Sequence, residues 1–168
     1  MTLETFNNLP REDARLELEK CCGASGWVSR MMDHFPFRTD HEMLERAKQI
    51  WDNECSENDW LEAFRHHPKI GDIDSLQKKF ASTSAWAGSE QAAVKSASPE
   101  TIHALAKAND EYEKKFGFIF IVCATGKSAE EMLDFLHRRM NNDYDTEIRI
   151  AAEEQKKITQ LRLQKLLS

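Results

Sequence analysis

The chain has 168 residues, of which 40% are hydrophobic and 31% are charged, and its formal net charge is -6. This apolar content is enough for a hydrophobic core of ordinary size, which excludes an intrinsically disordered chain. The net negative charge and the absence of a dense Lys/Arg block argue against binding to nucleic acid.

From the residues at its two ends we expect a chain without a targeting signal. The first residues include acid and precede no apolar run, so we expect no signal peptide. Apolar runs are too short to span a bilayer. The last residues, Leu166-Leu167-Ser168, differ from the common peroxisomal tripeptide. These features predict a cytoplasmic protein that is not embedded in a membrane.

The cysteines and histidines do not have metal-binding spacings. The sequence contains no Cys-x-x-Cys pair and no His-x-x-x-His pair, which would place two ligands on one helical face. We therefore predict no metal site and four reduced thiols, at Cys21, Cys22, Cys55 and Cys123.

Helix starts are well marked in the first part of the chain. A helix is predicted over 10–20, with Pro at its first position and Gly23 just beyond its end. Thr39 and Glu42 have the spacing of a capping box, which predicts a helix to about residue 54. Ser56, followed by acidic residues, is expected to cap a short helix that ends near His66.

Three further helices are predicted in the second half. Ser98-Pro99 is an N-cap followed by proline, and that helix is expected to end at Gly117. Ser128 and Glu131 have capping-box spacing for a helix to about residue 141. Asp145 is expected to cap a long final helix that reaches about residue 167.

The segment Phe118–Cys123 is β-branched and aromatic throughout. It fits a strand, a buried extended segment or a helical turn, but a lone strand would have no partner. Its backbone N–H groups need acceptors, and a ligand oxygen is one option beside plain packing in the core. The predicted fold class is all-α, with residues 1–168 forming a single compact multi-helix domain and a long C-terminal helix.

His67-Pro68 is the first candidate for chemistry. Proline disfavours the α conformation of the residue before it, so His67 is expected on a rigid turn after a helix. A histidine there suits general acid–base catalysis, because its ordinary pKa is about 6.5. The alternative is a helix C-cap, where a histidine interacts favourably with the helix dipole.

Two further candidate binding sites contain charged residues, Glu90 with Gln91 and Arg162. Glu90 and Gln91 stand in the first turns of a predicted helix, and a carboxylate beside a carboxamide can bind a urea-like edge. The alternative is a solvated pair at a helix start. Arg162 stands among leucines on the final helix, where it either binds an anion or extends its charged end to solvent.

Residues Ala124-Thr125-Gly126-Lys127-Ser128 resemble the end of a phosphate-binding P-loop. That motif requires a glycine five positions before Gly126, and the residue there is Ile121. Nucleotide binding is therefore not expected.

Taken together and in this order, the motifs resemble the OHCU decarboxylase family. The resemblance spans nearly the whole chain, from the Phe35-Pro36-Phe37 region to the final helix, and rests on His67-Pro68 with Gly71, Glu90-Gln91, Phe116-Gly117-Phe118 with Cys123-Ala124, and Leu161-Arg162-Leu163. It implies an all-α homodimer that decarboxylates 2-oxo-4-hydroxy-4-carboxy-5-ureidoimidazoline (OHCU) to (S)-allantoin and CO2 without a cofactor, in urate degradation.

The resemblance also implies roles for individual residues. His67 and Glu90 would be catalytic. Substrate-binding residues would be Pro68, Ala87, Gly88, Ser89, Glu90, Gln91, Phe120, Ile121, Val122, Cys123, Ala124 and Arg162. One position departs from the family pattern, because Ala87 stands where a serine is frequent. Ser84 or Ser89 would then have to supply the hydroxyl group.

Two other functions compete with this one. A helical interaction module would use its capped helices to present a groove to a partner protein. A hydrolase or another lyase acting on a related ureide would use the same residues on a different substrate. The interaction module predicts an exposed apolar stripe and no enclosed polar pocket, so convergence of His67, Glu90 and Arg162 around one cavity would argue against it. Product analysis separates the hydrolase or other lyase from a decarboxylase.

Overall fold

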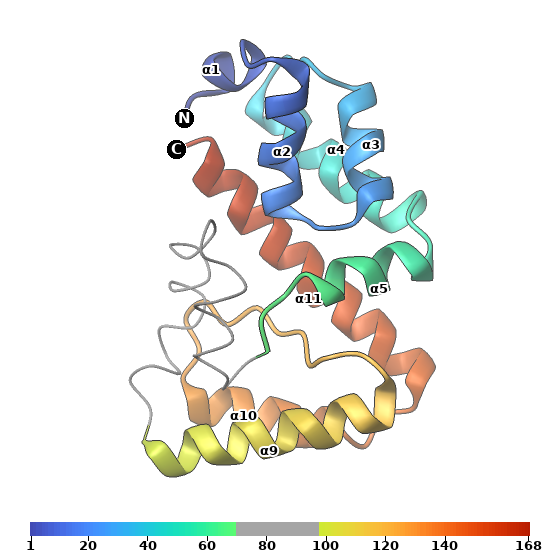
Figure 1. Ribbon diagram of the computed structural model, residues 1–168, viewed down its shortest axis with the longest axis vertical. Coiled ribbons are helices and arrows are strands. Elements are labelled where there is room, and N and C mark those ends of the chain that lie inside the picture. The colour runs from blue at the N-terminus through green and yellow to red at the C-terminus, as the bar shows by residue number, and fades with distance from the viewer. Residues whose placement is uncertain (70–97) are drawn as a thin grey trace. The chain divides into compact units, whose positions relative to one another are not determined.

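The computed structural model describes residues 1–69 and 98–168 (Figure 1), which form helices and, within these ranges, no strand. The all-α prediction is confirmed, and so is the long final helix. The helices are α1 (Leu3–Asn7), α2 (Arg11–Cys21), α3 (Ser25–Asp33), α4 (Asp40–Asn53), α5 (Glu57–Arg65), α9 (Pro99–Phe116), α10 (Ala129–Arg139) and α11 (Tyr144–Leu166).

The chain divides into two compact units, Met1–His66 with Gln155–Ser168, and His67–Glu154. In the first unit, α3 packs against α2, α4 and α5. The indole Nε1 of Trp27 on α3 donates to the carbonyl of Ala47 on α4 at 3.1 Å, which satisfies a polar group inside the core. The large fully buried side chains of this unit include Phe6, Leu18, Trp27, Met31, Met43, Ile50 and Phe64.

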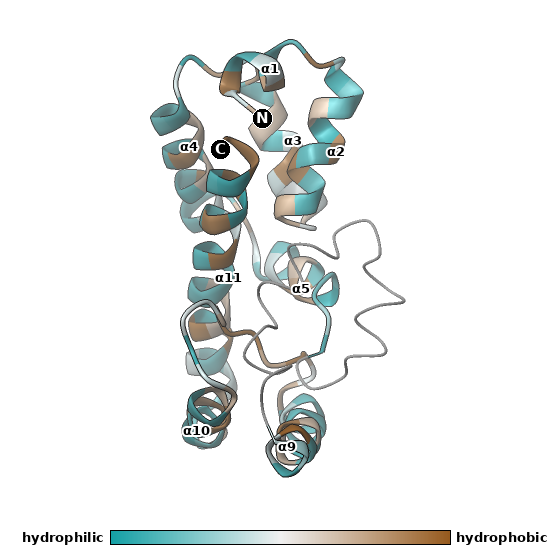
Figure 2. Cartoon of the chain, turned by 90° about the vertical axis from the view of Figure 1, so that its left-hand side faces the viewer, coloured by the Kyte–Doolittle hydropathy of each residue, from teal (hydrophilic) through white to brown (hydrophobic). Residues whose placement is uncertain are grey.

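The second unit contains α9, α10 and the segment between them. Helices α9 and α10 pack together, and Leu105, Met132 and Leu136 are fully buried. Figure 2 shows hydrophobic and hydrophilic residues interspersed along the helices, as expected where one helix face is buried and the other is hydrated. Within the described ranges, no helix is both long and apolar enough to cross a bilayer.

Helix α9 has the predicted boundaries. The Ser98 hydroxyl accepts from the backbone N–H of Thr101 at 3.2 Å, with Pro99 at the first helical position. Gly117 ends the helix at φ 81, in the left-handed region that favours glycine. Both ends follow from local chemistry, which explains why the sequence pattern located them.

The predicted capping boxes are only half formed. Thr39 accepts from the Glu42 N–H at 3.0 Å, but the Glu42 carboxylate accepts from the N–H of Arg38. Ser128 accepts from the Glu131 N–H at 3.1 Å, with no reciprocal bond among the described contacts. The reciprocal pair occurs at the start of α5, where Ser56 and Asp59 cap each other.

The predicted start of the final helix lies two residues too late in the chain. Helix α11 begins at Tyr144, and the Asp143 carboxylate, not that of Asp145, accepts from the backbone N–H of Thr146 at 2.8 Å. The pKa of Asp143 is lowered because its charged form accepts this hydrogen bond. Asp145 lies within the first turn.

Candidate functional site

His67 and Pro68 follow the end of α5 and are buried, with His67 exposing 8% of its surface. The helix ends at Arg65, with His66 as its C-cap, as predicted from the following proline. His67 is thus not the C-cap itself. It stands on backbone outside the helix, which is the setting proposed for an acid–base group.

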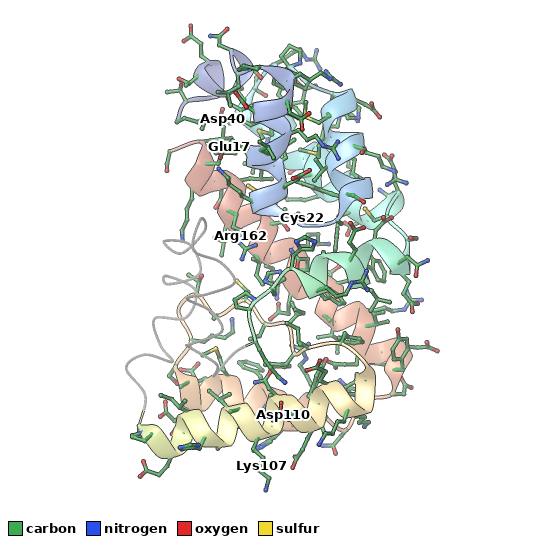
Figure 3. The ribbon with its side chains drawn as sticks, viewed as in Figure 1. Glu17, Cys22, Asp40, Lys107, Asp110 and Arg162 are labelled. Atoms are coloured by element: carbon green, nitrogen blue, oxygen red, sulfur yellow. The ribbon has the colours of Figure 1, made fainter. Side chains whose placement is uncertain are left out.

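Lys69 fastens this turn to α9. Its Nζ is 2.9 Å from Glu113 Oε2 and also donates to Asp110. Partial burial acts to lower the pKa of Lys69, but hydrogen bonds to the two carboxylates outweigh it and raise the pKa. The lysine therefore stays charged and ties the backbone two residues after His67 to one turn of α9. Figure 3 labels Asp110 on that helix, one turn after Lys107.

The segment Phe118–Ala124 is a buried coil, neither the strand nor the helical turn that its composition permitted. The Phe120 ring lies 5.3 Å from the Tyr112 ring in an edge-to-face arrangement. Tyr112 stands between Asp110 and Glu113 on α9, so the same turn of α9 holds this segment and Lys69. The residues predicted to bind substrate through their backbone, 120–124, are all buried.

Two cationic side chains donate hydrogen bonds to carbonyl oxygens of this segment. Arg139 Nη1 donates to the carbonyl of Ile121 at 2.8 Å, and Lys127 Nζ donates to the carbonyl of Cys123 at 2.8 Å. Among the described residues, no acceptor is found for the backbone N–H groups of 120–124. The carbonyls of Ile121 and Cys123 thus accept from cations, whereas the N–H groups of the segment lack an acceptor within the described residues. Lys127, the lysine of the P-loop-like sequence, thus bonds to a carbonyl of the preceding backbone.

Arg139 belongs to a buried charged cluster that the sequence did not reveal. Its Nε is 2.7 Å from Glu147 Oε1, and the two side chains are 9% and 0% exposed. Tyr112 donates its hydroxyl to the same carboxylate. Arg139 also lies 4.4 Å from the centre of the Phe120 ring. In the sequence, Arg139 looks like an ordinary cation in the last turn of a helix. Its acidic partner, Glu147, follows only after the turn to the next helix, so no spacing pattern joins the two residues.

Arg162 lies on α11 and is partly exposed. Burial raises the pKa of Cys22 to about 11, and the Arg162 guanidinium acts in the opposite direction. Burial also raises the pKa of Cys21, again opposed by Arg162. The guanidinium is therefore within electrostatic reach of both buried thiols, near the end of α2, where Figure 3 labels Arg162 and Cys22.

The remaining candidate residues lie outside the described residues. These are Ala87, Gly88, Ser89, Glu90 and Gln91, together with Ser84 and Gly71. Within residues 1–69 and 98–168, no three His, Cys, Asp or Glu side chains form a group that could hold a metal ion.

The chain resembles known proteins over most of its length. It matches the family model of OHCU decarboxylase over residues 7–164. It is 44% identical to the uric acid degradation bifunctional protein TTL of Arabidopsis thaliana over 154 residues, which are 90% of this chain and 47% of that protein. It is 29% identical to the 2-oxo-4-hydroxy-4-carboxy-5-ureidoimidazoline decarboxylase of Amia calva, over 98% of this chain and 87% of that protein.

Solved structures agree with the sequence match. A crystal structure of an OHCU decarboxylase in the presence of (S)-allantoin has a TM-score of 0.77 and 40% identity, over 90% of this chain and 96% of that one. An (S)-allantoin synthase with a TM-score of 0.69 and 17% identity shows the same fold. The chain spans 47% and 27% of the lengths of two bifunctional relatives, from Arabidopsis thaliana and a Bacillus species. The extent of the family match shows that this chain belongs to the OHCU decarboxylase family.

Proposed function

We propose that this chain decarboxylates OHCU to (S)-allantoin and CO2, the last step from urate to allantoin. The observation that carries the proposal is the family match over residues 7–164. The relative whose crystal structure was obtained in the presence of (S)-allantoin supports the same product, at 40% identity.

The substrate's chemistry explains why side chains alone suffice. Decarboxylation leaves an electron pair that usually passes to a cofactor. In OHCU, the carbon that bears the carboxylate adjoins a ring carbon doubly bonded to nitrogen. As the bond to CO2 breaks, its electron pair forms a double bond between these two carbons, and the C=N pair moves to nitrogen, which takes up a proton. The ring therefore acts as its own electron sink.

A second proton movement sets the stereochemistry. The intermediate carries a hydroxyl group on its carbon–carbon double bond. When that hydroxyl loses its proton and becomes a carbonyl, the carbon that bears the ureido group gains one. Delivery to a single face gives (S)-allantoin, whereas reaction in water gives a racemate. The protein must hold the carboxylate out of the ring plane, stabilise developing charge and place one proton donor.

In this proposal His67 transfers the proton. Its support is its burial, its position after the end of α5, and the attachment of its turn to α9 through Lys69. Glu90 would orient or polarise the ureido or hydroxyl group, and Gln91 would bind the urea-like edge. Ala87, Gly88 and Ser89 would complete that part of the site.

The remaining contacts would bind the anionic parts of the substrate. The backbone N–H groups of 120–124 would donate to carboxylate or carbonyl oxygens, supported by their lack of acceptors among the described residues. Arg162 would bind an anionic or carbonyl oxygen through its guanidinium. Pro68 would keep the turn beside His67 rigid.

The resemblance carries four further proposals. The enzyme would be a carbon–carbon lyase that needs no cofactor, a homodimer, a cytoplasmic protein, and a single domain over residues 1–168. Full activity after chelation and dialysis would support the absence of a cofactor, and sedimentation velocity measures the oligomeric state. Cell fractionation tests the cytoplasmic location, and a single unfolding transition tests the single domain.

The direct test of the activity uses OHCU freshly generated from urate by the two preceding enzymatic steps. Circular dichroism follows the optical activity of the product, and liberated CO2 is measured in parallel. The expected result is rapid formation of one allantoin enantiomer with stoichiometric CO2. Racemic allantoin at the spontaneous rate would contradict the proposal. A ring-opened or deaminated product without CO2 would favour the hydrolase.

A further inference from the structure

The peptide groups 121–122 and 123–124 are both held by cations at their carbonyl ends. Arg139 donates to the Ile121 carbonyl, and the same peptide group carries the N–H of Val122. Lys127 donates to the Cys123 carbonyl, and that peptide group carries the N–H of Ala124. The same arrangement, a cationic side chain donating to a backbone carbonyl, thus occurs twice at positions two residues apart.

A cation on a carbonyl oxygen changes the other end of the peptide group. Hydrogen bonds in series polarise one another, so a charged donor at C=O makes the N–H of the same amide a stronger donor. The effect is larger where water is excluded, and Val122 and Ala124 are 5% and 7% exposed. Neither N–H has an acceptor among the described residues. The polarised donors are thus available for a carboxylate or carbonyl oxygen of a ligand.

Stability alone does not explain why the core contains the buried Arg139–Glu147 ion pair. A buried ion pair loses hydration at both groups, and apolar side chains of the same volume often stabilise a core equally well. Glu147 is held from two other sides, by Tyr112 and by the Asn142 amide at 3.0 Å. A carboxylate fixed in this way fixes the guanidinium, and the guanidinium fixes the Ile121 carbonyl.

We propose that Arg139 and Lys127 are positioning residues that orient and polarise two peptide groups, so that the N–H groups of Val122 and Ala124 donate to carboxylate or carbonyl oxygens of a bound ligand. The proposal rests on the proposed function, since the ligand it names is the substrate's carboxylate or the carbonyl of the product. It deepens that function by assigning two cations that act through the backbone.

The first experiment observes the two amides directly, by proton–nitrogen NMR of the full chain with (S)-allantoin as the probe. In the wild type, the amide protons of Val122 and Ala124 are expected to move downfield as (S)-allantoin is added. In free Arg139→Met, the Val122 amide should lie upfield of its wild-type position, and in free Lys127→Met the Ala124 amide should do so. Each variant should affect mainly its own amide.

Matched controls are Arg138→Met and Lys114→Met, which remove exposed cations of the same kinds. They should leave both amides unchanged. Shifts spread over α9 and α10 in the Arg139 variant would indicate a structural role and overturn the proposal. Unchanged Val122 and Ala124 amides in both variants would overturn it as well.

A stability-matched pair separates positioning from folding. Arg139→Met leaves the buried Glu147 carboxylate without its cation, so the variant should melt below the wild type. The double variant Arg139→Met/Glu147→Gln removes the unpaired charge and should regain melting temperature. Its kcat/KM for OHCU should nevertheless stay at least about tenfold below wild type, because the Ile121 carbonyl still lacks its donor. Recovery of activity together with stability would overturn the proposal.

Arg139→Lys keeps the charge but lacks the fork that reaches Glu147 and Ile121 together. It should show activity between that of wild type and Arg139→Met. Failure of the proposed function is recognised separately: wild type would then neither turn over OHCU nor shift on addition of (S)-allantoin. The upfield positions in the two free variants would still report whether the cations polarise these amides.

Discussion

The backbone of Gly23 packs directly against the side chain of His66. A Cβ built on Gly23 would lie 2.3 Å from His66 Cγ and 2.6 Å from His66 Cβ. Both His66 atoms are next to the main chain, so they cannot move aside as the end of a long side chain can. Gly23 is therefore required by the close approach of the turn after α2 to the end of α5. The sequence suggested glycine there only as a helix terminator.

Gly23→Ala is expected to destabilise the fold by about 1–3 kcal/mol, because the added methyl overpacks the contact with His66. His66→Ala should relieve much of this loss, so a double-mutant cycle should give a coupling energy above about 1 kcal/mol. Urea unfolding measures each value. Gly126→Ala is the control: a Cβ there meets nothing within 4 Å, so its cost is backbone strain at φ 77 and should not change in the His66→Ala background. A cost for Gly23→Ala that persists unchanged in the His66→Ala background would contradict the account.

Lys69→Gln tests whether the attachment of the His67 turn to α9 supports catalysis. Stability should fall by about 1 kcal/mol or less, because the ion pairs are partly exposed. The kcat for OHCU should fall more, by about tenfold, because misplacing a catalytic group by 1 Å can cost up to about 100-fold. Lys107→Gln on the same helix should change neither quantity. A kcat within about twofold of wild type would show that the attachment does not position His67.

Tyr112→Phe tests the hydroxyl that donates to Glu147. The variant should lose about 1.5–3 kcal/mol near pH 7, because a charged acceptor loses a buried donor. Burial raises the pKa of Tyr112 beyond the titration range of the folded protein. The phenol therefore stays neutral when folded, and absorbance titration of folded wild type and variant should coincide.

The pH dependence of this contribution has a definite sign. A raised folded pKa favours the protonated form, so the contribution is complete below the ordinary tyrosine pKa of about 10 and declines above it. The stability advantage of wild type over Tyr112→Phe should shrink as the pH rises past that value. An advantage that grows with pH would show that the tyrosine ionises more easily in the fold.

Arg162→Ala should raise the KM for OHCU while leaving stability nearly intact. Loss of a charged hydrogen bond worth about 1.5–3 kcal/mol corresponds to an increase of roughly 10- to 150-fold. Gln164→Ala, an exposed position on α11, is the control. Steady-state kinetics and thermal unfolding give the two readouts. Extensive unfolding with an unchanged KM would assign Arg162 a structural role beside Cys21 and Cys22.

Local chemistry in the sequence located most helix ends but not all of them. Ser98, Pro99 and Gly117 act through bonds within a few residues, so their pattern was sufficient. Helix α3 was not predicted because its N-cap, Ala24, offers no side-chain hydrogen bond. The start of α11 was misplaced because Asp143 and Asp145 are both suitable caps by residue type.

The sequence predicted those parts of the candidate site that neighbouring residues define, but not those that depend on contacts between residues far apart in the chain. His67-Pro68 marked a turn after a helix from two adjacent residues. The apolar run after Gly117 predicted burial, but not the hydrogen bonds that Arg139 and Lys127 donate to its carbonyl oxygens. Arg139 meets Glu147 across the turn between α10 and α11, and no periodic pattern records that contact.

His67→Asn assayed with freshly generated OHCU is the most direct test of the central claim. Asparagine keeps the polarity and approximate size of the side chain but cannot exchange a proton at neutral pH. The kcat should fall by at least about 100-fold, as expected for loss of a general acid–base group, and allantoin should form as a racemate at the spontaneous rate. His137→Asn, an exposed position on α10, should retain full activity. A folded His67→Asn variant that still forms (S)-allantoin at the wild-type rate would contradict the account.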